Sequence, residues 1–225
     1  MSTALRTRFA AILFDCDGVL IDSERIARRS MQHSLASLGL EWSLEAVAAR
    51  FTGLSWPQCV AVLEQDMQLH IPANFHEQNR QFFDHLLRTE LVTMAGIEQV
   101  LSALSLPYAV VTNSMHAELN MKLQVAGLAE FFPPERRFDA EIMGVSKPDP
   151  AIYQQAAERM GVDVRDCLVL EDSFTGAQSA HAAGATLWLY RPQLSAEQAA
   201  AFNAQQILES WAAMPAVQPL KAVLS

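Results

Sequence analysis

The hydrophobic positions of the chain form two kinds of pattern, short continuous runs and longer segments with helical spacing. The continuous runs have the length of buried strands and predict strands at 9–14, 108–112, 167–170 and 186–190, with a shorter one around 138–142. Helical spacing predicts helices at about 96–104, 115–126 and 150–160 and a helix that ends at 183. Strands that alternate with helices indicate right-handed crossovers, so we predict an α/β fold with a parallel-sheet core.

The segment 22–91 has a different pattern, because it contains no convincing strand. We predict helices at 24–39, at 44–50 with Ser43 as its cap, from Pro57 through Met67, and in a last segment before Arg88. The sequence therefore predicts an all-helical domain of residues 22–91, inserted into a core domain made of residues 1–21 and 92–225.

Polar residues follow the predicted strands at the point where each strand ends. The first strand is followed by Asp15 and Asp17, and the others lead to further polar groups, namely Thr112, Asn113, Ser114, Glu171 and Asp172, while Lys147 precedes a predicted helix. The carboxyl ends of parallel strands meet at one edge of a sheet. Carboxylates beside a buried strand are disfavoured unless a cation offsets their charge, and a set of oxygen ligands suits Mg²⁺.

Each of these residues also has a simpler structural interpretation. An Asp-Gly pair is common in turns, Ser114 is placed to cap the next helix, Glu171 and Asp172 could cap another, and Lys147 could be a solvated loop lysine. Two additional carboxylates at the same edge would be unfavourable without a cation, which favours the functional interpretation.

Composition and charge narrow the class of protein. The chain has 225 residues, of which 51% are hydrophobic and 18% charged, and this is sufficient for a sizeable core. Its formal net charge of −9 argues against nucleic acid or an anionic membrane as the main partner. The three cysteines are widely spaced, which predicts reduced thiols and a cytoplasmic location. The apolar run before Asp15 is too short for a signal peptide or a membrane span.

The polar motifs, taken in order, resemble the four motifs of the haloacid dehalogenase superfamily. They read Phe-Asp15-Cys-Asp17-Gly18-Val-Leu, Val-Val-Thr112-Asn113, Ser-Lys147-Pro-Asp-Pro and Val-Leu-Glu171-Asp172-Ser, and they are followed by a small-residue helix that begins near Gly176. The resemblance covers essentially the whole chain. It implies a Rossmann-like core with an inserted helical cap of type 1.

The resemblance also implies roles for these residues. Asp15 would attack phosphorus and form an aspartyl-phosphate, and Asp17 would protonate the leaving oxygen and later deprotonate water. Phosphate would be bound by Gly18, Thr112, Asn113 and Ser114, with Lys147 supplying charge. Mg²⁺ would be held by Asp15, the main-chain carbonyl of Asp17, Asp172 and Glu171.

The implied activity is Mg²⁺-dependent hydrolysis of small phosphorylated metabolites: sugar phosphates, sugar-acid phosphates such as 6-phosphogluconate, or phosphoglycolate. Asp17 argues against the dehalogenase and phosphonatase branches, which lack an aspartate at that position. A β-phosphoglucomutase-like phosphotransferase is the alternative, although Ala27 occupies the place where that branch typically has a histidine. A phospho-accepting regulatory module is an alternative from another class, but such a module places its phosphorylated aspartate after a later strand and lacks a helical insertion. A binding protein that has lost catalytic activity is a third alternative, and it would have lost a motif residue.

The segment Arg50-Phe-Thr52-Gly53-Leu-Ser55 resembles the family's substrate-specificity loop. Its glycine permits an unusual backbone turn beside a cation and hydroxyl groups. An ordinary connection between helices is the alternative interpretation. We expect a small-molecule phosphate monoester as the partner of a monomer or weak homo-oligomer.

Overall fold

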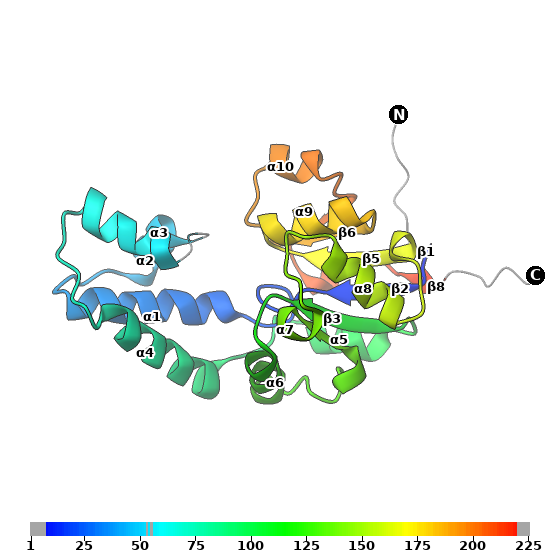
Figure 1. Ribbon diagram of the computed structural model, residues 1–225, viewed down its shortest axis with the longest axis horizontal. Helices are drawn as coiled ribbons and strands as arrows, with labels where there is room; N and C mark the ends of the chain where they lie inside the picture. The colour runs from blue at the N-terminus through cyan, green and yellow to red at the C-terminus, as the bar shows by residue number, and fades with distance from the viewer. Residues whose placement is uncertain (1–7, 53, 55, 220–225) are drawn as a thin grey trace, which may run out of the picture. The chain divides into compact units, whose positions relative to one another are not determined.

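The computed structural model describes residues 8–52, 54 and 56–219. Two compact units contain these residues (Figure 1): one is formed by the chain up to Ile21 and from Val92 onward, and the other by Asp22–Leu91. Each unit has a hydrophobic core of its own. The predicted Gly53 and Ser55 positions lie outside the described residues.

The first unit is built on a six-stranded sheet in the order β4-β3-β2-β5-β6-β7, and every strand pair in it is parallel. The strands are β2 (Ala11–Phe14), β3 (Tyr108–Thr112), β4 (Arg137–Asp139), β5 (Cys167–Glu171), β6 (Thr186–Tyr190) and β7 (Gln206–Leu208). A separate pair joins β1 (Arg8–Phe9) to β8 (Gln218–Pro219). The prediction of an α/β fold with a parallel-sheet core is confirmed.

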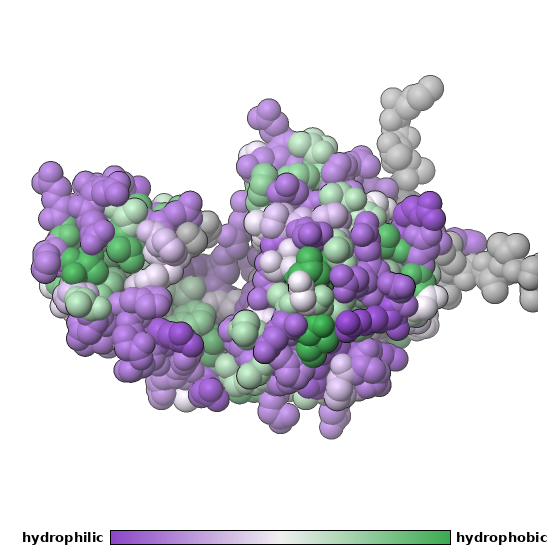
Figure 2. Space-filling model, in the orientation of Figure 1, coloured by the Kyte–Doolittle hydropathy of each residue, from purple (hydrophilic) through white to green (hydrophobic). Residues whose placement is uncertain are grey.

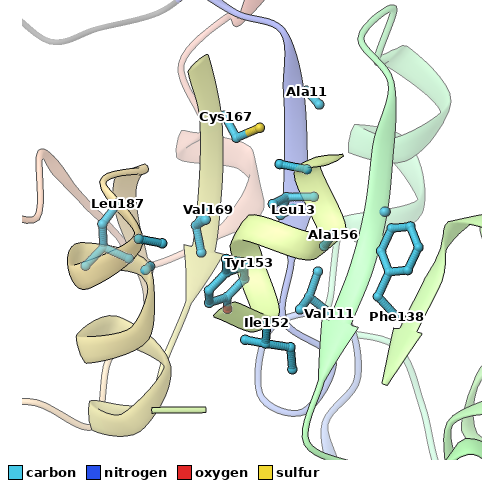
Figure 3. Close-up of a cluster of buried hydrophobic side chains, with 14 of the residues drawn as sticks. Ala11, Leu13, Val111, Phe138, Ile152, Tyr153, Ala156, Cys167, Val169 and Leu187 are labelled. Atoms are coloured by element: carbon cyan, nitrogen blue, oxygen red, sulfur yellow. The ribbon is translucent and has the colours of Figure 1, made fainter. Parts of the chain in front are cut away.

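Helices alternate with these strands as the hydrophobic spacing predicts. They are α5 (Ile97–Ala103), α6 (His116–Val125), α7 (Ala140–Met143), α8 (Ala151–Arg159), α9 (Phe174–Ala183) and α10 (Ala196–Ala201), with 3-10 turns at Pro134–Arg136, Val164–Asp166 and Trp211–Ala213. Strand side chains alternate between the two faces of the sheet. On one face, Leu13 and Val169 pack with Tyr153 and Ala156 of α8 (Figure 3).

Aromatic residues fill the opposite face. The Phe14 ring lies 6.1 Å from the Tyr108 ring and 6.0 Å from the Trp211 ring, while Trp211 also stacks on Tyr190 with ring centroids 4.4 Å apart. The indole nitrogen of Trp211 donates a hydrogen bond of 3.2 Å to the main-chain carbonyl of Val19. Aromatic packing beneath the loop that follows β2 therefore ties that loop to the C-terminal part of the chain.

The second unit contains α1 (Ser23–Ser37), α2 (Leu44–Phe51), α3 (Trp56–Ala61), a π-helix at Val62–Asp66 and α4 (Phe75–Glu90). Helices α1 and α4 run side by side (Figure 1). The Asn79 amide of α4 donates to Ser30 Oγ at 2.9 Å and to Ser34 Oγ at 2.8 Å, which satisfies polar groups between the two helices. Ser43 caps α2 by accepting a hydrogen bond from the main-chain N–H of Ala46, as predicted.

Two local predictions were wrong, and one predicted helix begins a residue later than expected. The strand expected over 138–142 ends at Asp139, because the Asp139 side chain accepts the main-chain N–H of Ile142 and starts α7. Ser114 does not cap α6: Met115 occupies the cap position, and the Ser114 hydroxyl bonds to other side chains. Helix α8 begins at Ala151, one residue later than expected, and the Asp149 side chain accepts the N–H of Ala151.

Hydrophilic residues dominate the face of each unit that Figure 2 shows, as expected for helices that turn their apolar sides inward. Among the described residues, no helix combines the length and the apolar character needed to cross a membrane.

Candidate active site

The candidate site lies at the carboxyl end of the sheet, where the strand order changes direction. After β2 the chain adds β3 and β4 on one side and then returns to place β5 on the other side of β2. Such a switch point leaves a crevice above the strand ends, where open α/β sheets bind ligands. Asp15 directly follows β2, and its main-chain N–H extends the ladder to the Leu170 carbonyl at 2.9 Å.

Lys147 supplies a positive charge beside Asp15. Its ammonium group donates hydrogen bonds to Asp15 Oδ1 and, at 2.6 Å, to Glu171 Oε1. All three residues are buried, with exposed fractions of 7% for Asp15, 6% for Lys147 and 0% for Glu171. The structure thus brings Asp15 together with Lys147, 132 positions later in the chain, and with Glu171, a further 24 positions on, as the sequence predicts for strand ends.

Burial raises the pKa of the Asp15 carboxyl group to about 7, because Lys147 only partly offsets burial and the negative charges of Glu171 and Asp17 add to it. For Lys147, burial favours the neutral amine, but Asp15 and Glu171 outweigh it and hold the pKa above its usual value. The lysine is therefore a fixed positive charge, and a cation bound beside Asp15 would favour its ionised form.

Both carboxylate oxygens of Glu171 have partners. Oε1 also accepts from the Tyr153 hydroxyl at 2.8 Å, and Oε2 accepts from the main-chain N–H of Asp172 at 3.1 Å and from the Ser173 hydroxyl at 3.0 Å. Tyr153 was missed in the sequence analysis. Its position on the apolar face of α8 marks it only as a core residue, although a buried tyrosine hydroxyl usually has a hydrogen-bond partner.

A cluster of carboxylates provides a possible cation site. Asp15, Glu171 and Asp172 each offer an oxygen, and these oxygens lie within 4.8 Å of one another. Gly18 permits this approach: it has a φ of +77°, and a Cβ atom there would lie 2.0 Å from Asp172 Oδ2. Buried oxygen donors without sulfur or imidazole fit a hard divalent cation such as Mg²⁺.

The residues at the carboxyl end of β3 support the site in two ways. The Asn113 side chain exchanges hydrogen bonds with the main chain of Lys147, at 2.8 Å from the Lys147 N–H and at 3.0 Å to the Lys147 carbonyl. Thr112 is 1% exposed, and its hydroxyl accepts the main-chain N–H of Ser114 at 3.1 Å. Asn113 therefore fixes the loop that carries Lys147, a contact that the sequence does not reveal.

The Asp17 side chain has a separate cation. Both of its carboxylate oxygens lie 2.9 Å from the ammonium nitrogen of Lys122, and Ser114 Oγ donates to Asp17 Oδ2 at 3.2 Å. Lys122 lies on α6, and its role was not predicted from the sequence. A signal was present, because the lysine falls between Leu119 and Leu123 on the face of the helix that is buried.

In the second unit, Arg50 lies in the last turn of α2, and Thr52 follows that helix. The Arg50 guanidinium forms an ion pair with Asp66, and both side chains are substantially exposed. The three cysteines are buried thiols, and burial raises the pKa of the Cys16 thiol above its usual value. Cys16 is therefore a packed side chain between the two aspartates.

Comparisons with known proteins agree with this geometry. The chain is 29% identical over 185 residues to a 6-phosphogluconate phosphatase of Escherichia coli, with 82% of this chain and 83% of that protein covered. It is 28% identical to a fructose-1-phosphate phosphatase of the same organism, with 79% and 94% covered.

Among solved structures, a HAD family hydrolase from Deinococcus radiodurans with bound phosphate and sodium superposes with a TM-score of 0.82 at 34% identity, covering 91% of this chain and 93% of the other. Residues 9–184 match the family model described as haloacid dehalogenase-like hydrolase. The predictions of the family and of a hydrolytic enzyme are confirmed: the chain belongs to the haloacid dehalogenase-like hydrolases.

Proposed function

We propose that this hydrolase is a Mg²⁺-dependent phosphatase that acts on small phosphate monoesters, with sugar phosphates and sugar-acid phosphates as the substrate class. The observation that carries the proposal is the buried contact of Asp15 with Lys147 beside the carboxylates of Glu171 and Asp172. A phosphoryl group needs a nucleophile, a positive charge and a hard cation at the same place, and this edge of the sheet offers residues for each.

In the proposed reaction, an Asp15 carboxylate oxygen attacks phosphorus as the bond from phosphorus to the ester oxygen breaks. Asp17, in its protonated form, gives its proton to the departing alcohol and becomes a carboxylate. Asp17 then removes a proton from water, which attacks the phosphorus of the aspartyl-phosphate and releases inorganic phosphate and free Asp15. Dividing hydrolysis into two in-line displacements replaces one difficult step by two easier ones.

The other residues bind and orient the phosphoryl group. Lys147 supplies a positive charge that Glu171 and Tyr153 hold in place, and the Thr112 hydroxyl together with the main chain of Asn113 forms the remaining side of the phosphate site. Asp15, Asp172 and the main-chain carbonyl of Asp17 would hold Mg²⁺, with Glu171 adjacent. The bound cation would neutralise the repulsion between the nucleophile and the phosphate.

The named relatives support the substrate class. The two relatives from Escherichia coli are named for a phosphorylated sugar acid and a phosphorylated sugar, and the Deinococcus protein holds phosphate and a cation.

We propose that the helical unit Asp22–Leu91 is the cap domain of the family and selects the substrate, with Arg50, Thr52, Gly53 and Ser55 as contributing residues. Three buried cysteines in the thiol form support a cytoplasmic location.

Phosphate release from p-nitrophenyl phosphate and from a panel of sugar and sugar-acid phosphates tests the proposal. We expect release that requires Mg²⁺, stops on addition of EDTA and is absent in Asp15→Asn. The matched control is Asp163→Asn, which makes the same change at an aspartate that pairs with Arg165 on the surface. Isomerised sugar phosphate without net release would support the mutase alternative instead, and no turnover on any substrate would contradict the proposal.

A further inference from the structure

Lys122 is a buried cation outside the group of residues that the sequence motifs identify. Its side chain is 4% exposed, whereas the Asp17 side chain beside it is 35% exposed. The ammonium nitrogen lies 2.9 Å from both oxygens of Asp17 and 2.9 Å from Ser114 Oγ, and it also contacts Glu118 one turn earlier on α6. A lysine without partners would be strongly disfavoured at this depth.

Lys122 is protonated at neutral pH. Burial alone would lower its pKa, but the negative charge of Asp17, with Cys16 and Glu118 contributing, raises the pKa above its usual value. The site therefore contains two buried ammonium groups, each directed at one of the two aspartates: Lys147 contacts Asp15, and Lys122 contacts Asp17.

The two contacts also separate the aspartates. Asp15 belongs to the carboxylate cluster with Glu171 and Asp172, and that cluster does not include Asp17 among the residues that the structure describes. An ammonium group that lies equally close to both oxygens of a carboxylate restrains its rotation, and the Ser114 hydroxyl adds a second restraint on Oδ2.

We propose that Lys122 is a positioning residue for Asp17: it orients the carboxylate that serves as general acid and base, and it keeps this carboxylate out of the carboxylate cluster. The inference rests on the proposed phosphatase function. It adds Lys122, which none of the four motifs contains, and it gives Ser114 the role of a second restraint on Asp17.

The proposal predicts that the loss of activity on substitution of Lys122 depends on the leaving group of the substrate. An alkoxide requires a proton from Asp17 as it departs, whereas p-nitrophenolate is stable enough to leave with little protonation. The ratio kcat/KM reports only steps up to release of the alcohol. Loss of correct positioning at Asp17 should therefore reduce kcat/KM for alkyl phosphates much more than for p-nitrophenyl phosphate.

The test compares Lys122→Met, which is one atom shorter than lysine and removes the charge, with wild type on p-nitrophenyl phosphate and on the alkyl phosphate that wild type hydrolyses fastest. Displacement of a catalytic group by about 1 Å costs on the order of 10²-fold, so we expect about that loss for the alkyl phosphate and less than about tenfold for p-nitrophenyl phosphate. Glu118→Gln is the matched control, because it removes the charge of the other carboxylate that contacts Lys122 and leaves the contact between Lys122 and Asp17.

A double variant separates positioning from general damage. If Lys122 acts through Asp17, Lys122→Met should cause little further loss in an Asp17→Asn background. Thermal unfolding of each variant checks the fold, and Lys122→Gln replaces Lys122→Met if the latter does not fold. Equal losses on both substrates, or full additivity with Asp17→Asn, would overturn the proposal while leaving the phosphatase function intact. A wild-type protein without any turnover would overturn both.

Discussion

Gly176 lies directly against the carboxylate of Glu171: a Cβ atom at residue 176 would lie 1.8 Å from Glu171 Oε1. The glycine is in the first turn of α9, and its main-chain N–H donates to Ser173 Oγ at 3.1 Å. The small residue at this position of α9 therefore has a structural role. It leaves room for the carboxylate that holds Lys147.

Gly176→Ala tests this relationship. Glycine in a helix is usually less favourable than alanine by about 1 kcal/mol, so alanine would ordinarily stabilise α9. Here we expect the opposite, a destabilisation of roughly 1–3 kcal/mol together with loss of turnover, because the methyl group displaces Glu171. Urea unfolding measures the stability, and Gln178→Ala at an exposed position of the same helix is the control. A stabilised and active Gly176→Ala protein would contradict the account.

The raised pKa of Asp15 predicts how the stability of the metal-free protein depends on pH. Below about pH 4, Asp15 is protonated in the folded and the unfolded chain. Between its usual value of 3.8 and its folded value of about 7, the unfolded chain releases the proton and the folded chain retains it, so stability falls as the pH rises. The full effect above pH 7 is on the order of 4 kcal/mol.

Asp15→Asn removes this ionisation. We therefore expect the variant to be more stable than wild type at pH 8 in EDTA, with an advantage that shrinks steadily towards pH 4 in urea unfolding experiments. Saturating Mg²⁺ should remove most of the difference, because a bound cation favours ionised Asp15. Parallel stability curves for the two proteins across this range would rule out the raised pKa.

Tyr153→Phe tests the support beneath Lys147. The Tyr153 hydroxyl donates to Glu171 Oε1, while the Tyr153 ring lies 5.2 Å from the Lys147 nitrogen and would be kept by phenylalanine. We expect a loss of about 1–3 kcal/mol in the free energy of unfolding, since a buried carboxylate oxygen loses one donor. Activity should fall but persist, because Lys147 still contacts Asp15. Unchanged stability in urea would show that the hydroxyl is dispensable.

Arg50→Ala tests the proposed role of the second unit in substrate selection. We expect a higher KM for a carboxylated or polyhydroxy substrate and nearly unchanged turnover of p-nitrophenyl phosphate. Stability should change by less than about 1 kcal/mol, because the ion pair with Asp66 is exposed. Asp66→Asn is the matched control: if it raises KM to the same degree, Arg50 acts through the ion pair rather than on the substrate. Equal loss on both substrates would reject the proposed role.

The parts of the fold that the sequence predicts are those encoded locally. Buried strands such as 108–112 are continuous apolar runs, and the polar residues that follow them must share one edge of a parallel sheet, so Asp15, Thr112 and Glu171 could be placed together in advance. The helical boundaries of 22–91 follow from caps such as Ser43. The π-helix after α3 was not predicted, because its residues have ordinary helical spacing.

The parts that the sequence does not predict depend on contacts between distant residues. The Lys122 contact with Asp17 joins residues 105 positions apart, and the Asn113 contact with Lys147 joins residues 34 positions apart. Ser114 illustrates the difficulty, since its type and place suggested a helix cap, whereas tertiary contacts direct its hydroxyl to Asp17. Local propensity cannot distinguish these outcomes when the competing partner comes from another element.

Chemical trapping of the acyl-phosphate shows whether Asp15 is the nucleophile. Asp17→Asn is mixed with p-nitrophenyl phosphate and Mg²⁺, quenched and reduced with borohydride, which converts an aspartyl-phosphate to homoserine. We expect homoserine at residue 15 in the peptide mass spectrum, and no modified residue when substrate is omitted or when Asp15→Asn is used. Release of nitrophenol with unmodified Asp15, or trapping at another aspartate, would contradict it.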